Sequence, residues 1–188
     1  MSSSLKAFLL SLIVGIGFVW VFIVWRSRTL TGEAEHHLSF IEQLEKSGIP
    51  DLQLEDIAGH AFKTGDMKHK VLLINFWASF CAPCLEEFPS MLKLLKEMDG
   101  QMELLAISQD TSVEEIRAFL KSFPEANDPK VHIVLDKDRK LAQQFGVDRL
   151  PESFLAGSGG KLAKKIIGSI HWYTPDSIKY VRSLSAAK

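Results

Sequence analysis

The hydrophobic pattern of the chain opens with an uncharged run over residues 7–25, after a short polar flank at 1–6. These nineteen residues would span about 28 Å as a helix, close to the roughly 30 Å hydrocarbon core of a bilayer. A cleavable signal peptide has a shorter apolar region and a small-residue cleavage site, whereas this run ends in Val24-Trp25-Arg26. The pattern therefore predicts an uncleaved, single transmembrane anchor rather than a buried soluble helix, with Trp20 and Trp25 as candidate interfacial residues.

Residues 26–48 follow the apolar run and are more polar, which indicates a tether between the anchor and the rest of the chain. Within the tether, apolar side chains recur at helical spacing at Leu38, Ile41 and Leu44, and Gly48 offers a stop. The spacing predicts a short amphipathic helix.

From residue 49 to 188, strand-like and helix-like runs alternate over the length of one ordinary domain. The run at 71–76 is short, apolar and rich in β-branched and aromatic residues, which predicts a buried strand. Around it we expect a small hairpin at 52–57 and 60–62, helices at 83–97, 112–123, 137–145 and 174–184, and strands at 102–108, 131–135, 153–156 and 162–167. The strand–helix–strand spacing implies parallel pairing, while the last two strands flank a Gly-rich turn and suit an antiparallel hairpin. The pattern therefore predicts an α/β domain with a mixed sheet and helices on both faces.

The composition of the chain excludes several kinds of function. The net charge of −1 gives no basis for binding nucleic acid or an acidic partner, and the chain has only two cysteines, Cys81 and Cys84. A disulfide framework needs several cysteines spread through a small domain, and a structural zinc site needs four ligands. We therefore expect no metal and no cofactor beyond a redox-active disulfide between these two residues. Two inert buried thiols, or half a zinc site shared between two chains, are the alternatives.

The two cysteines form the motif Cys81-Ala82-Pro83-Cys84, which directly follows the predicted central strand and begins the predicted helix. Pro83 suits the first helical turn, where a missing N–H leaves no bond unmade. Cys81 is thereby placed at a helix amino terminus, where unpaired N–H groups and the helix dipole favour the thiolate. Cys84 lies one turn deeper, close enough for a tight disulfide. The motif predicts that Cys81 is the nucleophile and Cys84 the resolving thiol.

Glu87 is the candidate proton acceptor for this pair. It lies three residues after Cys84, on nearly the same helix face. Because Cys84 is expected to be the more buried sulfur, it needs a group that takes its proton, and the Glu87 carboxylate can do so directly or through water. A solvated glutamate beside Glu86 is the alternative.

The segment 75–84, NFWASFCAPC, followed by Glu87-Phe88-Pro89, resembles the active-site segment of the thioredoxin superfamily. It is most similar to the membrane-anchored TlpA/ResA-like branch, and a second matching segment is 146–155, GVDRLPESFL. The resemblance extends from about residue 49 to the end of the chain. It implies a thioredoxin-like fold with an additional N-terminal hairpin, an insertion at about 111–136, and thiol-disulfide oxidoreductase activity. Phe80 departs from the family pattern, in which a tryptophan usually precedes the first cysteine, and Gly157 stands where an acidic residue is more common.

The resemblance also implies site residues outside the CxxC motif. In the family, the proline that matches Pro151 is cis and faces the cysteines, where its loop offers backbone for an incoming peptide strand. With Leu150 before it, and with Phe80, it forms the expected substrate-binding surface. An ordinary turn proline is the alternative for Pro151. Glu87 matches the family's Cys-x-x-Cys-x-x-Glu pattern, which supports its predicted role.

A substrate and a location follow from the resemblance as well. The family's substrate would be the oxidised CxxCH pair of apocytochrome c, with a membrane electron donor recharging the cysteines. The protein would cross the cytoplasmic membrane once, with its catalytic domain outside the cytoplasm. The flanking charges, Lys6 on one side and Arg26 and Arg28 on the other, are balanced or lean towards a cytoplasmic domain. We follow the resemblance, because a lone redox pair makes most sense where disulfides persist.

The direction of electron flow is not encoded in a CxxC motif alone. Ala82-Pro83 lacks a charged or imidazole-bearing insert that would strongly stabilise a thiolate, which favours a reductant. A general disulfide reductant or isomerase, an oxidant, and a tethered binding or chaperone module with a vestigial CxxC are the alternatives. A peroxiredoxin-type peroxidase is disfavoured, because Ala78 stands where that class has a threonine three residues before its cysteine.

Overall fold

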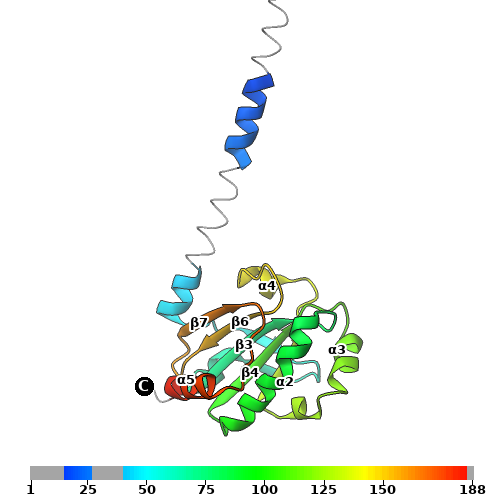
Figure 1. Cartoon of the computed structure of the whole chain (residues 1–188), viewed down its shortest axis with the longest axis vertical. Helices are drawn as coiled ribbons and strands as arrows, with labels where there is room; N and C mark the ends of the chain where they lie inside the picture. The colour runs from blue at the N-terminus through cyan, green and yellow to red at the C-terminus, as the bar shows by residue number, and fades with distance from the viewer. Residues whose placement is uncertain (1–14, 27–39, 186–188) are drawn as a thin grey trace, which may run out of the picture. The chain divides into compact units, whose positions relative to one another are not determined.

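The computed structural model describes residues 15–26 and 40–185, which are coloured in Figure 1. The chain divides into two units, Met1–Phe40 and Ile41–Lys188. The described part of the first unit contains a helix at 15–26 whose apolar side chains are exposed, among them Phe18, Trp20 and Trp25. Within the described ranges, none of the helices combines the length and the apolar character needed to cross a bilayer. Residues 7–14 of the expected anchor lie outside those ranges, so the anchor stays a prediction.

A second helix, at 40–47, lies where the sequence predicts a short helix in the tether. Leu44 is buried, and Gly48 ends the helix in a left-handed conformation with φ of +87°. The amide of Ile49 then donates to the carbonyl of Gly160 at 2.7 Å. The predicted helix and its stop are thus confirmed, while Leu38 lies outside the described residues.

The core of the second unit is a five-stranded sheet with the order β5-β4-β3-β6-β7. Its strands are β3 (Val71–Trp77), β4 (Met102–Ser108), β5 (Val131–Leu135), β6 (Glu152–Ala156) and β7 (Leu162–Ile167). β3 pairs in parallel with β4, as β4 does with β5, while β6 is antiparallel to both β3 and β7. β1 (Gln53–Glu55) and β2 (Ala61–Lys63) form a separate antiparallel hairpin. The predicted mixed sheet and the preceding hairpin are confirmed.

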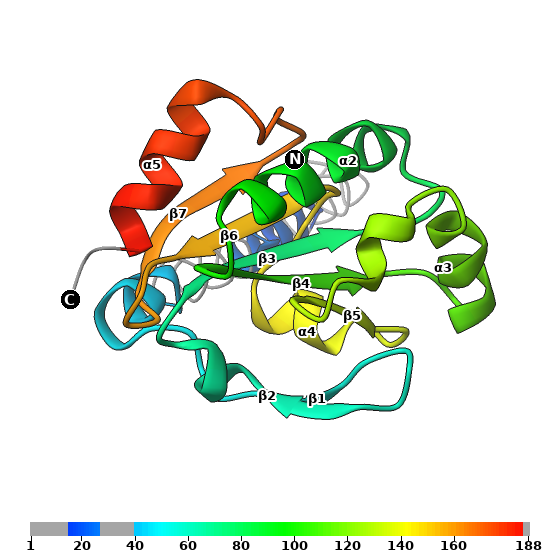
Figure 2. The same cartoon turned by 90° about the horizontal axis from the view of Figure 1, so that it is seen from below.

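Helices cover both faces of this sheet. They are α2 (Ala82–Glu97), α3 (Val113–Leu120), α4 (Lys140–Gln144) and α5 (Pro175–Ser185). Because alternate residues of a strand point to opposite faces, Leu73 and Trp77 of β3 join the buried cluster formed with α2, α3 and α5. Phe76 instead contacts Phe145, just after α4, and Phe154, with ring centroids 5.5 and 5.9 Å apart. Figure 2 shows α2 and α5 on one side of the sheet and α4 on the other.

Several predicted boundaries are corrected. α3 ends at Leu120 rather than near residue 123, and a 3-10 helix, η2 (Pro124–Asn127), follows it. α4 begins at residue 140 rather than 137, because Arg139 is left-handed and both oxygens of Asp136 accept amide hydrogen bonds from the first turn. A second 3-10 helix, η1 (Thr64–Met67), lies in a stretch for which no element was predicted. The first hairpin strand is shorter than expected, at 53–55 rather than 52–57, and the second lies one residue later, at 61–63 rather than 60–62.

Candidate active site

Cys81 and Cys84 form a disulfide at the amino end of α2, with an S–S distance of 2.08 Å and a Cα–Cα distance of 5.3 Å. Cys81 is the N-cap residue, and Pro83 lies in the first helical turn as predicted. Cys81 is partly exposed, whereas Cys84 is 2% exposed and belongs to the main buried cluster. The sulfur at the helix mouth is therefore the one that a partner can reach first.

The turn before Cys81 is held by a buried carboxylate that the sequence analysis missed. Asp110 accepts hydrogen bonds from the Ser79 amide at 3.1 Å and from the Ser79 hydroxyl at 2.7 Å. It also accepts one from Ser108 Oγ at 2.6 Å. An acidic residue two positions past the end of β4 was the available signal, because sites in open α/β sheets gather at the carboxyl ends of strands. Asp110 thus fixes the turn before Cys81 from the end of the neighbouring strand.

Trp77, at the end of β3, packs against aromatic residues of α2 and α3 near the site. Its ring stacks on Phe88 of α2 at 5.5 Å and lies 4.7 Å from Phe119 of α3. It is buried, and its indole Nε1 has no hydrogen-bond partner among the described residues. These contacts agree with a structural tryptophan.

Glu87 is 2% exposed, unlike its neighbour Glu86, which faces solvent. Its Oε1 accepts hydrogen bonds from the indole Nε1 of Trp172 at 2.6 Å and from the amide of Ile170 at 3.3 Å. Its Oε2 is buried and has no partner among the described residues. Burial raises the pKa of Glu87 to about 7, and the hydrogen bonds from Trp172 and Ile170 oppose that rise. The carboxyl therefore changes charge near neutral pH, as a proton acceptor in this pH range requires.

Trp172 belongs to residues 168–172, hereafter the 168–172 segment, which follows β7 and was not predicted to contribute to the site. The Trp172 amide donates to Ser90 Oγ at 3.0 Å, and that hydroxyl donates to the Glu87 carbonyl at 2.7 Å. At the other end, the amide of Gly168 donates to the carbonyl of Pro151 at 2.9 Å. The segment therefore links α2 to the loop that contains Pro151.

The Leu150–Pro151 peptide bond is cis, as the resemblance implied. Leu150 is partly exposed and packs against the same buried cluster as Cys81 and Cys84. Just after this loop, Ser153 of β6 pairs with Asn75 of β3, which is buried and donates to Ser153 Oγ at 2.9 Å. Phe80 is 73% exposed immediately before Cys81. An exposed apolar residue thus precedes Cys81 in the chain, and Leu150 packs against the cluster that contains Cys84.

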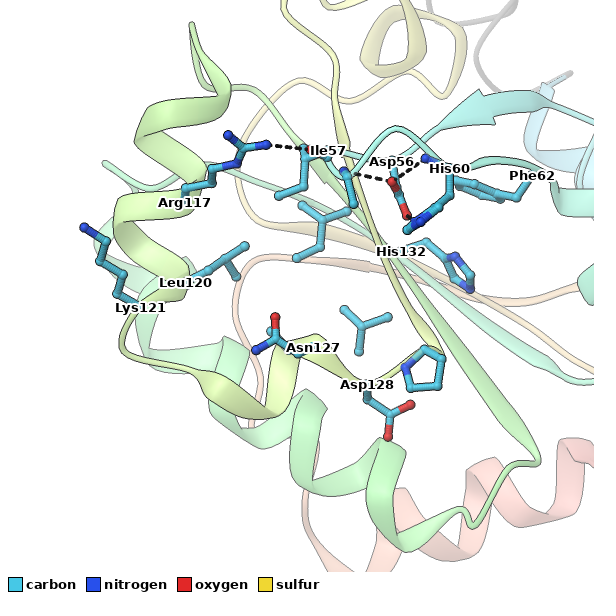
Figure 3. A pocket seen from close by; sticks show the side chains of 15 residues that line it. Asp56, Ile57, His60, Phe62, Arg117, Leu120, Lys121, Asn127, Asp128 and His132 are labelled. Carbon is cyan, nitrogen blue, oxygen red and sulfur yellow. Dashed lines mark hydrogen bonds and ion pairs between the residues drawn. The ribbon is translucent and has the colours of Figure 1, made fainter.

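A separate cavity of about 800 Å³ lies at the β5 edge of the sheet, lined by the turn after β1, α3, η2 and β5. Figure 3 shows its side chains, with Arg117 Nη2 donating to the Ile57 carbonyl at 3.1 Å. Its lining includes neither cysteine, nor Glu87, nor the proline loop. The cavity is therefore not part of the redox site.

A strand, a redox-active cysteine pair at the following helix and a cis-proline loop, all on a mixed sheet, define the class of thioredoxin-like thiol-disulfide oxidoreductases. A family model described as Redoxin matches residues 44–181. The chain therefore belongs to the Redoxin family. Thiol-disulfide oxidoreductase ResA of Bacillus subtilis is 35% identical over 127 residues, covering 67% of this chain and 69% of the relative.

Solved structures agree on the fold. StoA from Bacillus subtilis superposes with a TM-score of 0.56 at 23% identity, covering 71% of this chain and 96% of StoA. A thiol:disulfide interchange protein of the thioredoxin family from Chlorobium tepidum gives a TM-score of 0.63 at 19% identity, covering 74% and 96%. The thioredoxin-like fold and the oxidoreductase class predicted from the sequence are confirmed.

Proposed function

We propose that this protein is a membrane-anchored reductant of disulfide bonds in proteins outside the cytoplasm. The observation that carries the proposal is the Cys81–Cys84 bridge at the amino end of α2, with the buried carboxyl of Glu87 one turn further along. A reachable sulfur, a buried sulfur and a buried acid on one helix are the groups that a two-step thiol–disulfide exchange needs.

The exchange begins from the dithiol form. The Cys81 thiolate attacks one sulfur of a substrate disulfide, which forms a mixed disulfide and releases the other substrate sulfur as a thiolate. Cys84 then gives its proton to Glu87, and the Cys84 thiolate attacks the Cys81 sulfur. This second attack breaks the mixed disulfide, releases the remaining substrate sulfur and forms the Cys81–Cys84 bridge. Two electrons thus pass from the pair to the substrate, and a dithiol donor at the membrane restores them.

The substrate class in this proposal is the oxidised CxxCH pair of apocytochrome c, as the family resemblance implies. Phe80 and Leu150 supply apolar contacts beside Cys81, and the Pro151 loop supplies backbone to an extended peptide. A membrane anchor is supported by the uncharged run at 7–25 and by the apolar, exposed side chains of the helix at 15–26. The anchor would keep the site close to substrates and electron donors at the membrane.

The redox potential of the full-length chain tests this function. We expect a value near about −270 mV against a glutathione series, in the range of reductants. A value near about −120 mV would make the protein an oxidant and would contradict the proposed direction. A pair that cannot be reduced and reoxidised at all would leave only a binding or chaperone role.

The same preparation identifies the substrate through Cys84→Ala, which removes the resolving thiol. This variant should accumulate a mixed disulfide with an apocytochrome c peptide that carries CxxCH, whereas Cys81→Ala should not. Equal trapping of unrelated disulfide peptides would instead indicate a general reductant.

A further inference from the structure

The hydrogen bonds around Glu87 are unequal in a way that the exchange reaction itself does not explain. Two donors, Trp172 Nε1 and the Ile170 amide, converge on Oε1, while the buried Oε2 has no partner among the described residues. A buried carboxyl group contributes most to folding stability when both of its oxygens are hydrogen-bonded, so an oxygen without a hydrogen bond lowers stability. An acid that must accept a proton, however, needs one oxygen kept open.

We propose that Trp172 is a positioning residue for the resolving step: it holds Glu87 by Oε1 and so leaves Oε2 to receive the proton of Cys84. This inference rests on the proposed role of Glu87. The proton passes from the Cys84 sulfur to Oε2 and later to solvent, so Trp172 itself exchanges none.

The backbone around Trp172 supports a positioning role. Its amide is bonded to Ser90 Oγ, and the same hydroxyl is bonded to the Glu87 carbonyl, so the indole and the carboxyl are fixed to one turn of α2. Trp172 is itself buried, which limits the motion of its ring. A tryptophan that only filled the core would not need its N–H directed at an ionisable group.

Titratable side chains flank Glu87 and Trp172 in the sequence. Glu86 on α2 and His171 in the 168–172 segment flank the two residues in sequence, and both are exposed. In the dithiol form Cys84 joins them. In the oxidised form the cysteines do not titrate, so the exposed imidazole of His171 is the neighbouring group to control for.

The first test follows the indole N–H of Trp172 by ¹H–¹⁵N NMR in the oxidised, full-length chain. Trp172→Phe assigns the signal. In the wild-type chain, the chemical shift of this N–H signal should change with pH, with a midpoint near about 7. The pH dependence should disappear in Glu87→Gln and remain in His171→Gln. A signal that is insensitive to pH, or one that still titrates in Glu87→Gln, would overturn the contact on which the proposal depends.

The second test compares the pH dependence of the resolving step in Trp172→Phe and Tyr173→Phe. Tyr173 is the adjacent, exposed aromatic residue, and it is not one of the two hydrogen-bond donors to the Glu87 carboxylate. Loss of the indole bond removes a donor that favours the carboxylate, so the midpoint in Trp172→Phe should rise by about one pH unit. The step should then be about tenfold slower at pH 6 and recover at higher pH, while Tyr173→Phe stays at the wild-type midpoint.

The two tests separate the failure of this inference from that of the proposed function. An unchanged midpoint in a folded Trp172→Phe variant, as judged by circular dichroism, would refute the positioning role. A resolving step that is unaffected by Glu87→Gln would instead refute the role of Glu87, even if the NMR contact is present.

Discussion

A carboxyl group as buried as that of Glu87 is costly to ionise, and this cost has a measurable pH dependence. Below about pH 4.5 the side chain is protonated in both the folded and the unfolded chain. Between about 4.5 and 7 the unfolded chain releases the proton while the folded chain keeps it, because burial raises the pKa. The folded state then binds more protons, so the free energy of unfolding falls as pH rises through this window.

Glu87→Gln should remove this pH dependence. We expect the variant to match the wild type near pH 4 and to be more stable by about 2–3 kcal/mol at pH 8, when oxidised protein is unfolded in urea. Glu86→Gln, on the exposed side of the same helix, is the control and should change stability by less than about 0.5 kcal/mol. A constant difference between Glu87→Gln and wild type at all pH values would contradict the raised pKa.

The residues of the site differ in how far the sequence reveals them. The spacing of Cys81, Cys84 and Glu87 is local, so helical geometry alone places them together. Asp110 and Trp172 reach the site across 31 and 85 residues of chain, and no periodic pattern marks such contacts. Only the fold brings these two side chains to Ser79 and Glu87, the residues on either side of the cysteine pair.

At the scale of elements, Gly48 is the residue on which the chain's entry into the domain depends. A Cβ at this position would lie 2.8 Å from the carbonyl oxygen of Gly160, the same atom that accepts the Ile49 amide. Because the obstacle is backbone, it cannot move aside as a flexible side chain would.

Gly48→Ala should therefore lower the free energy of unfolding by about 2–3 kcal/mol, combining the cost of a left-handed alanine with the clash. Gly59→Ala is a matched control, since Gly59 has φ of +88° but open space around the new methyl group. It should cost only about 1 kcal/mol. Urea unfolding of both variants measures these changes. Equal decreases in the free energy of unfolding would mean that the contact with Gly160 is unimportant.

The strands of the five-stranded sheet were predicted more accurately than α3 and α4, for a physical reason. β3 and β4 are buried along their whole length, so uninterrupted apolar runs define their limits. The start of α4 depends on where the carboxylate of Asp136 is anchored, and the end of α3 depends on how Pro124 is accommodated. Such side-chain and turn geometry is only weakly encoded in hydrophobic periodicity.

At the scale of the whole molecule, the proposed function requires the domain to lie outside the cytoplasm. A reporter enzyme that is active only there, fused after residue 188, should be active in cells. The same fusion without residues 7–25 should be silent, because the chain then lacks its uncharged run. A silent full-length fusion with normal expression would place the domain on the cytoplasmic side, as the flanking charges alone suggest.

The bond between Gly168 and Pro151 has a consequence for how this protein can be altered. The 168–172 segment is hydrogen-bonded to Pro151 through its first residue and to Glu87 on α2 through its last. A change that shifts this connection alters both places together. Under the proposed function, peptide binding at the proline loop and the rate of peptide release therefore cannot be adjusted independently. Engineering of partner choice is then better directed at Phe80, whose side chain is exposed and which has no part in that connection.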